Sequence, residues 1–276
     1  MSKIPLAGVI GCPIGHSKSP LVHGSWLREY GLRGHYVPLH VDPADLETVL
    51  RTMPRMGFVG ANVTIPHKEH VLTLADDVSP VAARIGAANT LTFGADGHIH
   101  ADNTDGYGFL ANLRQAAPDW QPSAAPALVL GAGGAARAVI VALLDAGVPE
   151  VRLCNRTRAR AEGLAQEFGP QVTVCDWADR AQGLDDLGLL VNTSALGMAG
   201  NPALDMPLDG LSPAALVTDI VYTPLMTDLL IRAQARGNPV VDGLGMLLHQ
   251  AVPGFERWFG QTPQVTDALR LAVLGQ

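Results

Sequence analysis

The residues best suited to proton chemistry in this sequence are a lysine and an aspartate. Lys68 follows the polar segment 62–64 and the dipeptide Pro66-His67, where we expect a helix to begin. A helix N-terminus disfavours a cation, so the pKa of Lys68 should fall and its amine should seek a carboxylate. Asp105 offers that carboxylate. The pair suits general acid–base catalysis; the alternatives are an ordinary surface lysine and an aspartate that caps the next helix.

A glycine-rich turn after an apolar strand indicates a nucleotide site. Residues 127–130 are apolar, residues 131–138 have the sequence GAGGAARA, and a helical stretch and a second apolar run at 151–154 follow. Gly131 and Gly133 would let a pyrophosphate approach backbone N–H groups at the positive end of the helix. Ala replaces the third glycine of the dinucleotide pattern, which the pattern tolerates. Glycine turns also serve plain α/β packing, so the loop alone leaves both interpretations open.

The end of the second strand favours NADP over NAD. NAD-binding proteins usually carry an acidic residue about 20 residues after the glycine loop, to bind the ribose 2′-hydroxyl. Here that place holds Asn155-Arg156-Thr157, with Arg158 and Arg160 just beyond. Arginine suits a 2′-phosphate, because its planar cation binds phosphate oxygens bidentately. The alternative is a solvated basic helix start, which would oppose the helix dipole.

Composition excludes several classes of function. The 276 residues are 47% apolar and 16% charged, and the net charge of −7 argues against nucleic acid or an anionic membrane as a partner. No apolar run is long enough to span a bilayer, and the N-terminus lacks the features of a signal peptide. Three unpaired cysteines suggest a reducing compartment, so we expect a cytoplasmic protein. The pairs His67/His70 and His98/His100 have no third ligand at a recognised spacing, so we take them as surface or loop histidines and predict no metal site.

Alternating apolar runs and helical stretches predict an α/β fold. We expect strands at 6–10, 35–41, 58–63, 127–130, 151–154, 171–175, 188–192, 215–221 and 239–241, and a hairpin at 88–93 and 98–101. We expect helices at 20–30 and 43–53, with Ser19 and Asp42 as their N-caps. Further helices should begin near residue 67, run from the glycine turn to 146, run from the segment 242–246 to 258, and cover 106–116, 224–236 and 264–274. The polar strand-to-helix turns 11–19 and 62–68 should lie at the carboxyl ends of strands, where ligands bind. Residues 116–126 are the most linker-like stretch.

Taken together, stretches along nearly the whole chain resemble one family, the NADP-dependent shikimate dehydrogenases. The stretches, in the order of the family, are GCPIGHSKSP (11–20), NVTIPHK (62–68), GAANTL (86–91), DNTDGYG (102–108), GAGGAARA (131–138), NRT (155–157), VNTSALGM (191–198) and DGLGMLLHQA (242–251). Any one could occur by chance, whereas the ordered set is highly specific.

The resemblance assigns roles to particular positions. It implies that Lys68 and Asp105 are the catalytic pair. The positions it implies for substrate binding are Ser17, Ser19, Asn62, Thr64, Asn89, Tyr222 and Gln250. The positions it implies for cofactor binding are Gly131, Ala132, Gly133, Gly134, Ala135, Asn155, Arg156, Thr157, Arg160, Ile220 and Gly243. Quinate-using relatives tend to carry Thr at position 19, so Ser19 favours shikimate.

The resemblance also implies an architecture and a reaction. Two α/β domains should flank a cleft: a substrate-binding domain at 1–104, completed by 243–276, and a Rossmann-type NADP-binding domain at 105–242. The expected reaction is reversible reduction of 3-dehydroshikimate to shikimate by NADPH, in aromatic amino-acid biosynthesis. A homodimer is compatible with the resemblance. Three alternatives stay open: an NAD-using quinate/shikimate dehydrogenase, a nucleotide-sensing regulator that has lost turnover, and a folate-linked dehydrogenase, which the substrate loops do not support.

Overall fold

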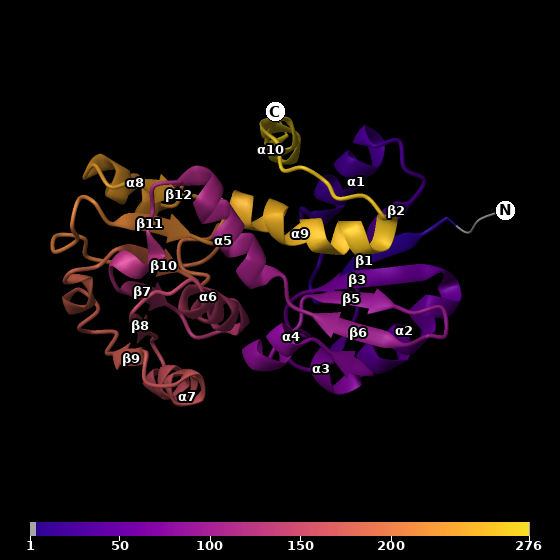
Figure 1. Cartoon of the computed structure of the whole chain (residues 1–276), viewed down its shortest axis with the longest axis horizontal. Helices are drawn as coiled ribbons and strands as arrows, with labels where there is room; N and C mark the ends of the chain where they lie inside the picture. The colour runs from indigo at the N-terminus through magenta and orange to yellow at the C-terminus, as the bar shows by residue number, and fades with distance from the viewer. Residues whose placement is uncertain (1–3, 276) are drawn as a thin grey trace. The chain divides into compact units, whose positions relative to one another are not determined.

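The chain folds as two compact units (Figure 1). The computed structural model describes residues 4–275. The first unit consists of the chain up to Gly108 and the chain from Leu247 onward, and the second is Phe109–Met246. Both boundaries fall inside helices, α5 (Asp105–Ala116) and α9 (Leu244–Phe259), so each of these helices contributes to both units.

The first unit is built on a mixed sheet. Within residues 4–275 its strands are β1 (Leu6–Gly11), β2 (His35–His40), β3 (Phe58–Val63), β4 (Asp77–Val78), β5 (Thr90–Phe93) and β6 (Ile99–Asp102). They lie in the order β2-β1-β3-β5-β6-β4. Only β5 runs antiparallel to its neighbours, because it forms a hairpin with β6. The carboxyl ends of β1, β2 and β3 therefore meet at one edge of the sheet.

Side chains of alternate strand residues cover the two faces of this sheet. Ile10, for example, packs with Leu91 and Ile99 in one buried cluster, whereas Val9 packs with Trp258 in another. The helices of this unit are α1 (Ser19–Glu29), α2 (Leu46–Thr52), α3 (Val71–Leu74), α4 (Pro80–Ile85) and α10 (Asp267–Leu274), with 3₁₀ turns at Pro43–Asp45 and Met53–Met56.

The second unit is built on a fully parallel sheet. Its strands are β7 (Ala127–Leu130), β8 (Val151–Cys154), β9 (Val172–Cys175), β10 (Leu189–Asn192), β11 (Leu216–Asp219) and β12 (Val240–Val241). The order β12-β11-β10-β7-β8-β9 places the first strand of the unit at the centre and reverses direction between β7 and β10. This is the Rossmann order, whose ligand crevice lies beyond the carboxyl ends of the strands at that reversal.

Both faces of the parallel sheet are buried. On β7, Ala127 and Val129 belong to one core cluster and Leu128 and Leu130 to another. Burial on both sides explains why these strands are continuous apolar runs in the sequence. The helices of this unit are α6 (Gly134–Asp145), α7 (Arg158–Phe168) and α8 (Asp228–Ala235), with 3₁₀ turns at Pro122–Ala124 and Gln182–Leu184.

The predicted fold class is confirmed, and the predicted strands are found with ends that shift by a few residues. The hairpin at 88–93 and 98–101 is also confirmed. Neither β4 nor α4, both of which are short, was predicted from the sequence. The N-cap prediction for Ser19 is wrong, because Ser19 is already the first residue of α1. Asp42 does occupy the N-cap position before Pro43, but of a 3₁₀ turn, and its side chain forms no capping hydrogen bond.

The helix expected from residue 67 is wrong in extent. The described helix α3 covers only Val71–Leu74, and Lys68 lies in the turn before it. The carbonyl of Lys68 accepts a hydrogen bond from the backbone N–H of Ala88 (2.8 Å), a residue far along the chain. The backbone here is therefore held by tertiary contacts. The helix-dipole argument for the reactivity of Lys68 does not apply.

Candidate active site

Lys68 and Asp105 form a largely buried ion pair in the first unit. The Lys68 Nζ atom donates to Asp105 Oδ2 at 2.6 Å, and the two side chains are 18% and 2% exposed. Among the described residues, Asp105 is the only hydrogen-bond partner of that ammonium group. An ammonium has three donors, so two N–H groups remain for a ligand. The carboxylate of Asp105 contacts side chains and does not cap α5, which rules out the capping alternative.

Asn89 holds the other oxygen of that carboxylate. Its Nδ2 atom donates to Asp105 Oδ1 at 2.7 Å, while its Oδ1 atom accepts from the backbone N–H of Thr104 at 2.8 Å. A backbone N–H can only donate, so the Asn89 amide has one consistent orientation. Its NH₂ group must then face Asp105. Asn89, which the resemblance assigns to substrate binding, thus also positions the ion pair.

A second network ties Asn62 to the sheet edge. Tyr36 donates its hydroxyl to Asn62 Oδ1 at 2.7 Å, and Asn62 Nδ2 donates to the carbonyl of Asn89 at 3.1 Å. Burial raises the pKa of Tyr36 well above its usual value, and a hydrogen bond with the Ser19 side chain opposes this. Ser19, Tyr36 and Asn62 therefore form one chain of polar contacts that leads to Asn89. The sequence motifs contained no signal for Tyr36.

The other predicted substrate residues divide between the two units. Ser17 Oγ accepts from the backbone N–H of Ser19 at 3.3 Å, in the loop after β1. Thr64 directly follows β3, and Gln250, on α9, accepts on its backbone carbonyl from Thr104 Oγ1 at 2.8 Å. Tyr222 belongs to the second unit, where burial raises the pKa of its phenol. Among the predicted substrate residues of the first unit, Asn89 contacts the Lys68–Asp105 pair directly, and Asn62 contacts the carbonyl of Asn89.

Two histidines of the first unit are buried. His67, expected on the surface or in a loop, is 1% exposed, and its Nε2 atom lies 2.8 Å from the carbonyl of Val41. His67 does lie in a loop, but its side chain is not at the surface, because the turn before α3 folds it inward. His23 on α1 stacks on the ring of Tyr36, with the two ring centroids 3.9 Å apart, and both of its nitrogens are buried. Burial lowers the pKa of His23 to about 3, against an opposing hydrogen-bond effect of Asn62.

The glycine loop of the second unit lies at the carboxyl end of β7. Gly131 has φ of 111°, and a Cβ atom there would lie 2.8 Å from Thr193 Oγ1, so both backbone and space require glycine. Gly133 is the N-cap of α6, and no side chain caps that helix. The first-turn N–H groups, contributed by Gly134 and Ala135 among others, are therefore available to an anion. The loop 131–135, Ala132 included, fits the pyrophosphate of a dinucleotide.

The arginines after β8 differ in their partners. Arg158 is bound by Glu162 at 2.7 Å and by Asp176 at 2.6 Å. Arg156 and Arg160 are exposed, and neither forms an ion pair within the part of the chain that the structure describes. Asn155 Nδ2 donates to the carbonyl of Thr157 at 2.8 Å, which shapes the turn that presents Arg156. Arg156 therefore fits a 2′-phosphate, whereas Arg158 is already neutralised.

The last two predicted cofactor residues meet at the ends of β11 and β12. A Cβ atom on Gly243 would lie 2.4 Å from the carbonyl of Ile220, so only glycine fits there. Next to them, the buried Asp219 accepts from Asn192, Thr227 and the N–H of Val221 at 2.8–3.0 Å. Burial raises the pKa of Asp219 to about 6 even though these three hydrogen bonds lower it. Sequence reasoning missed this group, which ties β10 to β11.

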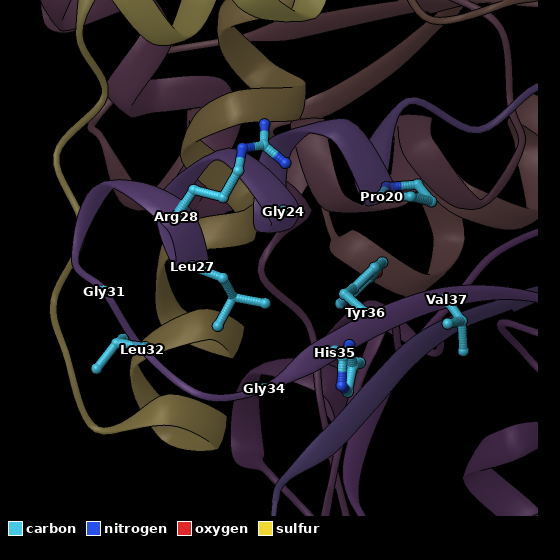
Figure 2. A pocket seen from close by; sticks show the side chains of 10 residues that line it. All are labelled: Pro20, Gly24, Leu27, Arg28, Gly31, Leu32, Gly34, His35, Tyr36 and Val37. Carbon is cyan, nitrogen blue, oxygen red and sulfur yellow. The ribbon is translucent and has the colours of Figure 1, made fainter.

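A separate hollow lies between α1 and β2. Figure 2 shows its lining, which includes Leu27, Arg28 and Tyr36, and its volume is about 540 Å³. Neither Lys68 nor Asp105 lines it. Its wall is shared with the site only through Tyr36, whose hydroxyl reaches Asn62. None of the predicted catalytic or substrate-binding residues lines this hollow.

Comparison with known families identifies this arrangement. Residues 9–91 match the family described as the shikimate dehydrogenase substrate binding domain, residues 114–196 match shikimate / quinate 5-dehydrogenase, and residues 243–272 match the shikimate 5′-dehydrogenase C-terminal domain. A protein of Cereibacter sphaeroides named shikimate dehydrogenase (NADP(+)) is 65% identical over 272 residues, which are 99% of this chain and 98% of that protein. The chain belongs to the shikimate dehydrogenase family.

Solved structures of the family have the same fold. Shikimate 5-dehydrogenase of Thermus thermophilus, in complex with NADP(H) and shikimate, is 37% identical, with a TM-score of 0.87 over 99% of each chain. Quinate dehydrogenase of Corynebacterium glutamicum, in complex with NAD, is 31% identical, with a TM-score of 0.90 over 98% of this chain and 99% of that one. The family thus includes proteins named for either acid and bound to either nicotinamide cofactor. Among the described residues, no helix is both long and apolar enough to cross a membrane.

Proposed function

We propose that this chain catalyses the reversible NADPH-dependent reduction of 3-dehydroshikimate to shikimate, with Lys68 and Asp105 as the catalytic pair. The observation that carries the proposal is the 2.6 Å ion pair, held from behind by Asn89, in a chain of the shikimate dehydrogenase family. Close relatives are named for this NADP-dependent activity. The reaction belongs to the pathway that makes aromatic amino acids.

Lys68 has the properties of a proton donor to the developing alcohol oxygen. Its ammonium keeps two N–H groups beyond the one given to Asp105. The carboxylate of Asp105 accepts from the ammonium and fixes its direction, because Asn89 holds the other carboxylate oxygen. At 18% exposure Lys68 can recover its proton from water after each turnover. In the oxidation direction the neutral amine accepts the alcohol proton.

The hydroxyl and amide groups around this pair suit a polyhydroxylated carboxylic acid. We assign the substrate carboxylate to Ser17 and Ser19, and the ring hydroxyls to Asn62, Thr64, Asn89 and Gln250. We assign a further substrate contact to Tyr222. These groups would hold the ring in one orientation, which converts binding energy into rate. Ser at position 19 supports shikimate over quinate.

The second unit supplies the cofactor site in this proposal. The uncapped start of α6 suits the pyrophosphate of NADP, and the unpaired Arg156 and Arg160, with Asn155 and Thr157, suit its 2′-phosphate. Ile220 and Gly243 would lie against the remainder of the cofactor. When bound, NADPH supplies the hydride that reduces the ketone.

The test is a crossed assay at the absorbance band of the reduced nicotinamide. Purified protein is mixed with shikimate or quinate and with NADP⁺ or NAD⁺. Fast reduction with shikimate and NADP⁺ alone is the expected result. Preference for quinate with NAD⁺ would instead assign the chain to the activity named for the Corynebacterium relative. Ligand binding without reduction in any combination would support the nucleotide-sensing alternative.

We further propose that the enzyme works in the cytoplasm and as a homodimer. Its cysteines, Cys12, Cys154 and Cys175, are free thiols, which fits a reducing compartment. Light scattering of the purified chain measures the assembly state directly, and a monomer mass would remove the homodimer from the proposal.

A further inference from the structure

Three side chains that are distant in the sequence converge at the edge of the first sheet. Cys12 directly follows β1, His40 ends β2, and Asp42 lies two residues beyond it. Gly11 and His40 are register partners in the parallel β1–β2 pair, so the two strand ends place these residues side by side. Cys12 Sγ lies 3.5 Å from His40 Nε2 and 3.4 Å from Asp42 Oδ1, and His40 Nε2 lies 3.5 Å from Asp42 Oδ1.

The triangle is not the relay of a cysteine nucleophile. In a catalytic triad the acid contacts one ring nitrogen of the histidine and the nucleophile contacts the other. Here Cys12 and Asp42 both face Nε2 of His40. All three ligand atoms therefore surround one point, which is the geometry of a shared ion.

The three distances match the edges of a tetrahedral zinc site. With Zn–S of about 2.3 Å, Zn–N of about 2.0–2.1 Å and Zn–O of about 2.0–2.2 Å, tetrahedral angles place sulfur about 3.6 Å from nitrogen and from oxygen, and nitrogen about 3.4 Å from oxygen. The observed separations of 3.5, 3.4 and 3.5 Å agree to within about 0.2 Å, the tolerance for such sites. We propose that Cys12, His40 and Asp42 bind a Zn²⁺ ion, with water as the fourth ligand.

The donor set and its exposure favour zinc over other ions. A thiolate and an imidazole select zinc against magnesium and calcium, which take oxygen ligands. The side chains of His40 and Asp42 are 55% and 66% exposed, so the ion and its water ligand have access from solvent. Without metal, the Cys12 thiol donates to Asp42. Zinc takes the place of that proton, which is released to solvent as the thiolate–metal bond forms.

The site adjoins the loop that carries two predicted substrate residues. Cys12 begins the loop 12–18, which includes Ser17, and its backbone N–H donates to the carbonyl of Ile65, next to Thr64, at 3.1 Å. A zinc ion would link the ends of β1 and β2 at the start of this loop. Zinc binding should therefore raise the thermal unfolding temperature of the chain.

The experiment measures zinc and cobalt binding to the full chain after removal of metals with a chelator. We expect one Zn²⁺ per chain, competition between protein and a chromophoric chelator, and, with Co²⁺, a thiolate-to-cobalt charge-transfer band together with tetrahedral visible bands. Cys12→Ser and His40→Gln should each weaken zinc binding by more than about 100-fold, beyond the loss that follows removal of an outer-shell partner. The cobalt–thiolate band should disappear in Cys12→Ser.

Two control variants match these changes. Cys175→Ser removes a free thiol elsewhere. His100→Gln removes a histidine whose Nδ1 atom pairs with Asp77 at 2.6 Å, in a pair that has no thiol beside it. Both controls should bind zinc as the parent does. The cobalt spectrum of the unmodified chain tests the site even if a variant does not fold. Absence of the charge-transfer band there, or equal zinc affinity in the site and control variants, would overturn the proposal.

Discussion

The two units hold their predicted functional side chains in opposite ways. In the first unit, Lys68, Asp105 and Asn89 are held by mutual hydrogen bonds of 2.6–2.7 Å in a nearly dry environment. In the second unit, Arg156 is exposed on a turn that is held by a hydrogen bond from the Asn155 side chain to the carbonyl of Thr157. Proton transfer needs a preset geometry, whereas an arginine that binds phosphate can be ordered by its ligand. In the proposed function, the proton-transfer pair is thus ordered during folding, whereas Arg156 would be ordered when NADP binds.

The largest expected effect concerns the Lys68–Asp105 ion pair. Lys68→Ala should lower kcat by about 1,000-fold, within the range for loss of a general acid–base group, and leave NADP affinity nearly unchanged. NADP affinity is measured by calorimetry and kcat from the absorbance assay. Retention of most of the rate would remove Lys68 from the mechanism. A parallel loss of NADP binding would show that the substitution also changes the cofactor site.

The next effect concerns the ligand-ordered arginine. Arg156→Gln should raise the KM for NADP⁺ by about 10- to 100-fold, because a charged hydrogen bond to phosphate contributes about 1.5–3 kcal/mol. The KM for NAD⁺ should not change, since NAD⁺ lacks the 2′-phosphate. Arg158→Gln is the matched control, because Glu162 and Asp176 already bind that arginine. Equal effects of the two substitutions would contradict the proposed role of Arg156.

The smallest effect concerns the buried His23, which stacks on Tyr36 in the first unit. The folded-state pKa of His23 is about 3, below the usual 6.5, so the unfolded chain takes up the proton first as the pH falls. The neutral ring therefore costs nothing above pH 6.5, and stability is lost progressively between pH 6.5 and 3. At pH 5 this loss amounts to about 2 kcal/mol.

Urea unfolding at pH 7 and pH 5 measures this term. His23→Phe should reduce the loss of stability between the two pH values, whereas His100→Gln, at an exposed ion pair, should leave it as in the parent. An unchanged pH dependence in His23→Phe would mean that the buried histidine does not carry this part of the acid sensitivity.

The sequence by itself determined the fold class, the family and the strand pattern. Continuous apolar runs such as 127–130 and the glycine turn after them have local causes: burial on both sheet faces and a backbone angle at Gly131 that requires glycine. Such features can be predicted from one segment at a time, because the immediate surroundings of each residue determine its type.

Tertiary structure alone decided which side chains meet. Local reasoning put Lys68 on a helix N-terminus and His67 on the surface or in a loop. In the structure the carbonyl of Lys68 accepts from the N–H of Ala88, and the His67 side chain is buried with Nε2 against the carbonyl of Val41. No spacing in the sequence predicts the orientation of the Asn89 amide. Nor does any spacing predict that Cys12 contacts His40 and Asp42. The physical reason is that parallel strands bring distant segments into register only once the sheet has formed, so contacts at their ends are properties of the sheet and not of any one segment.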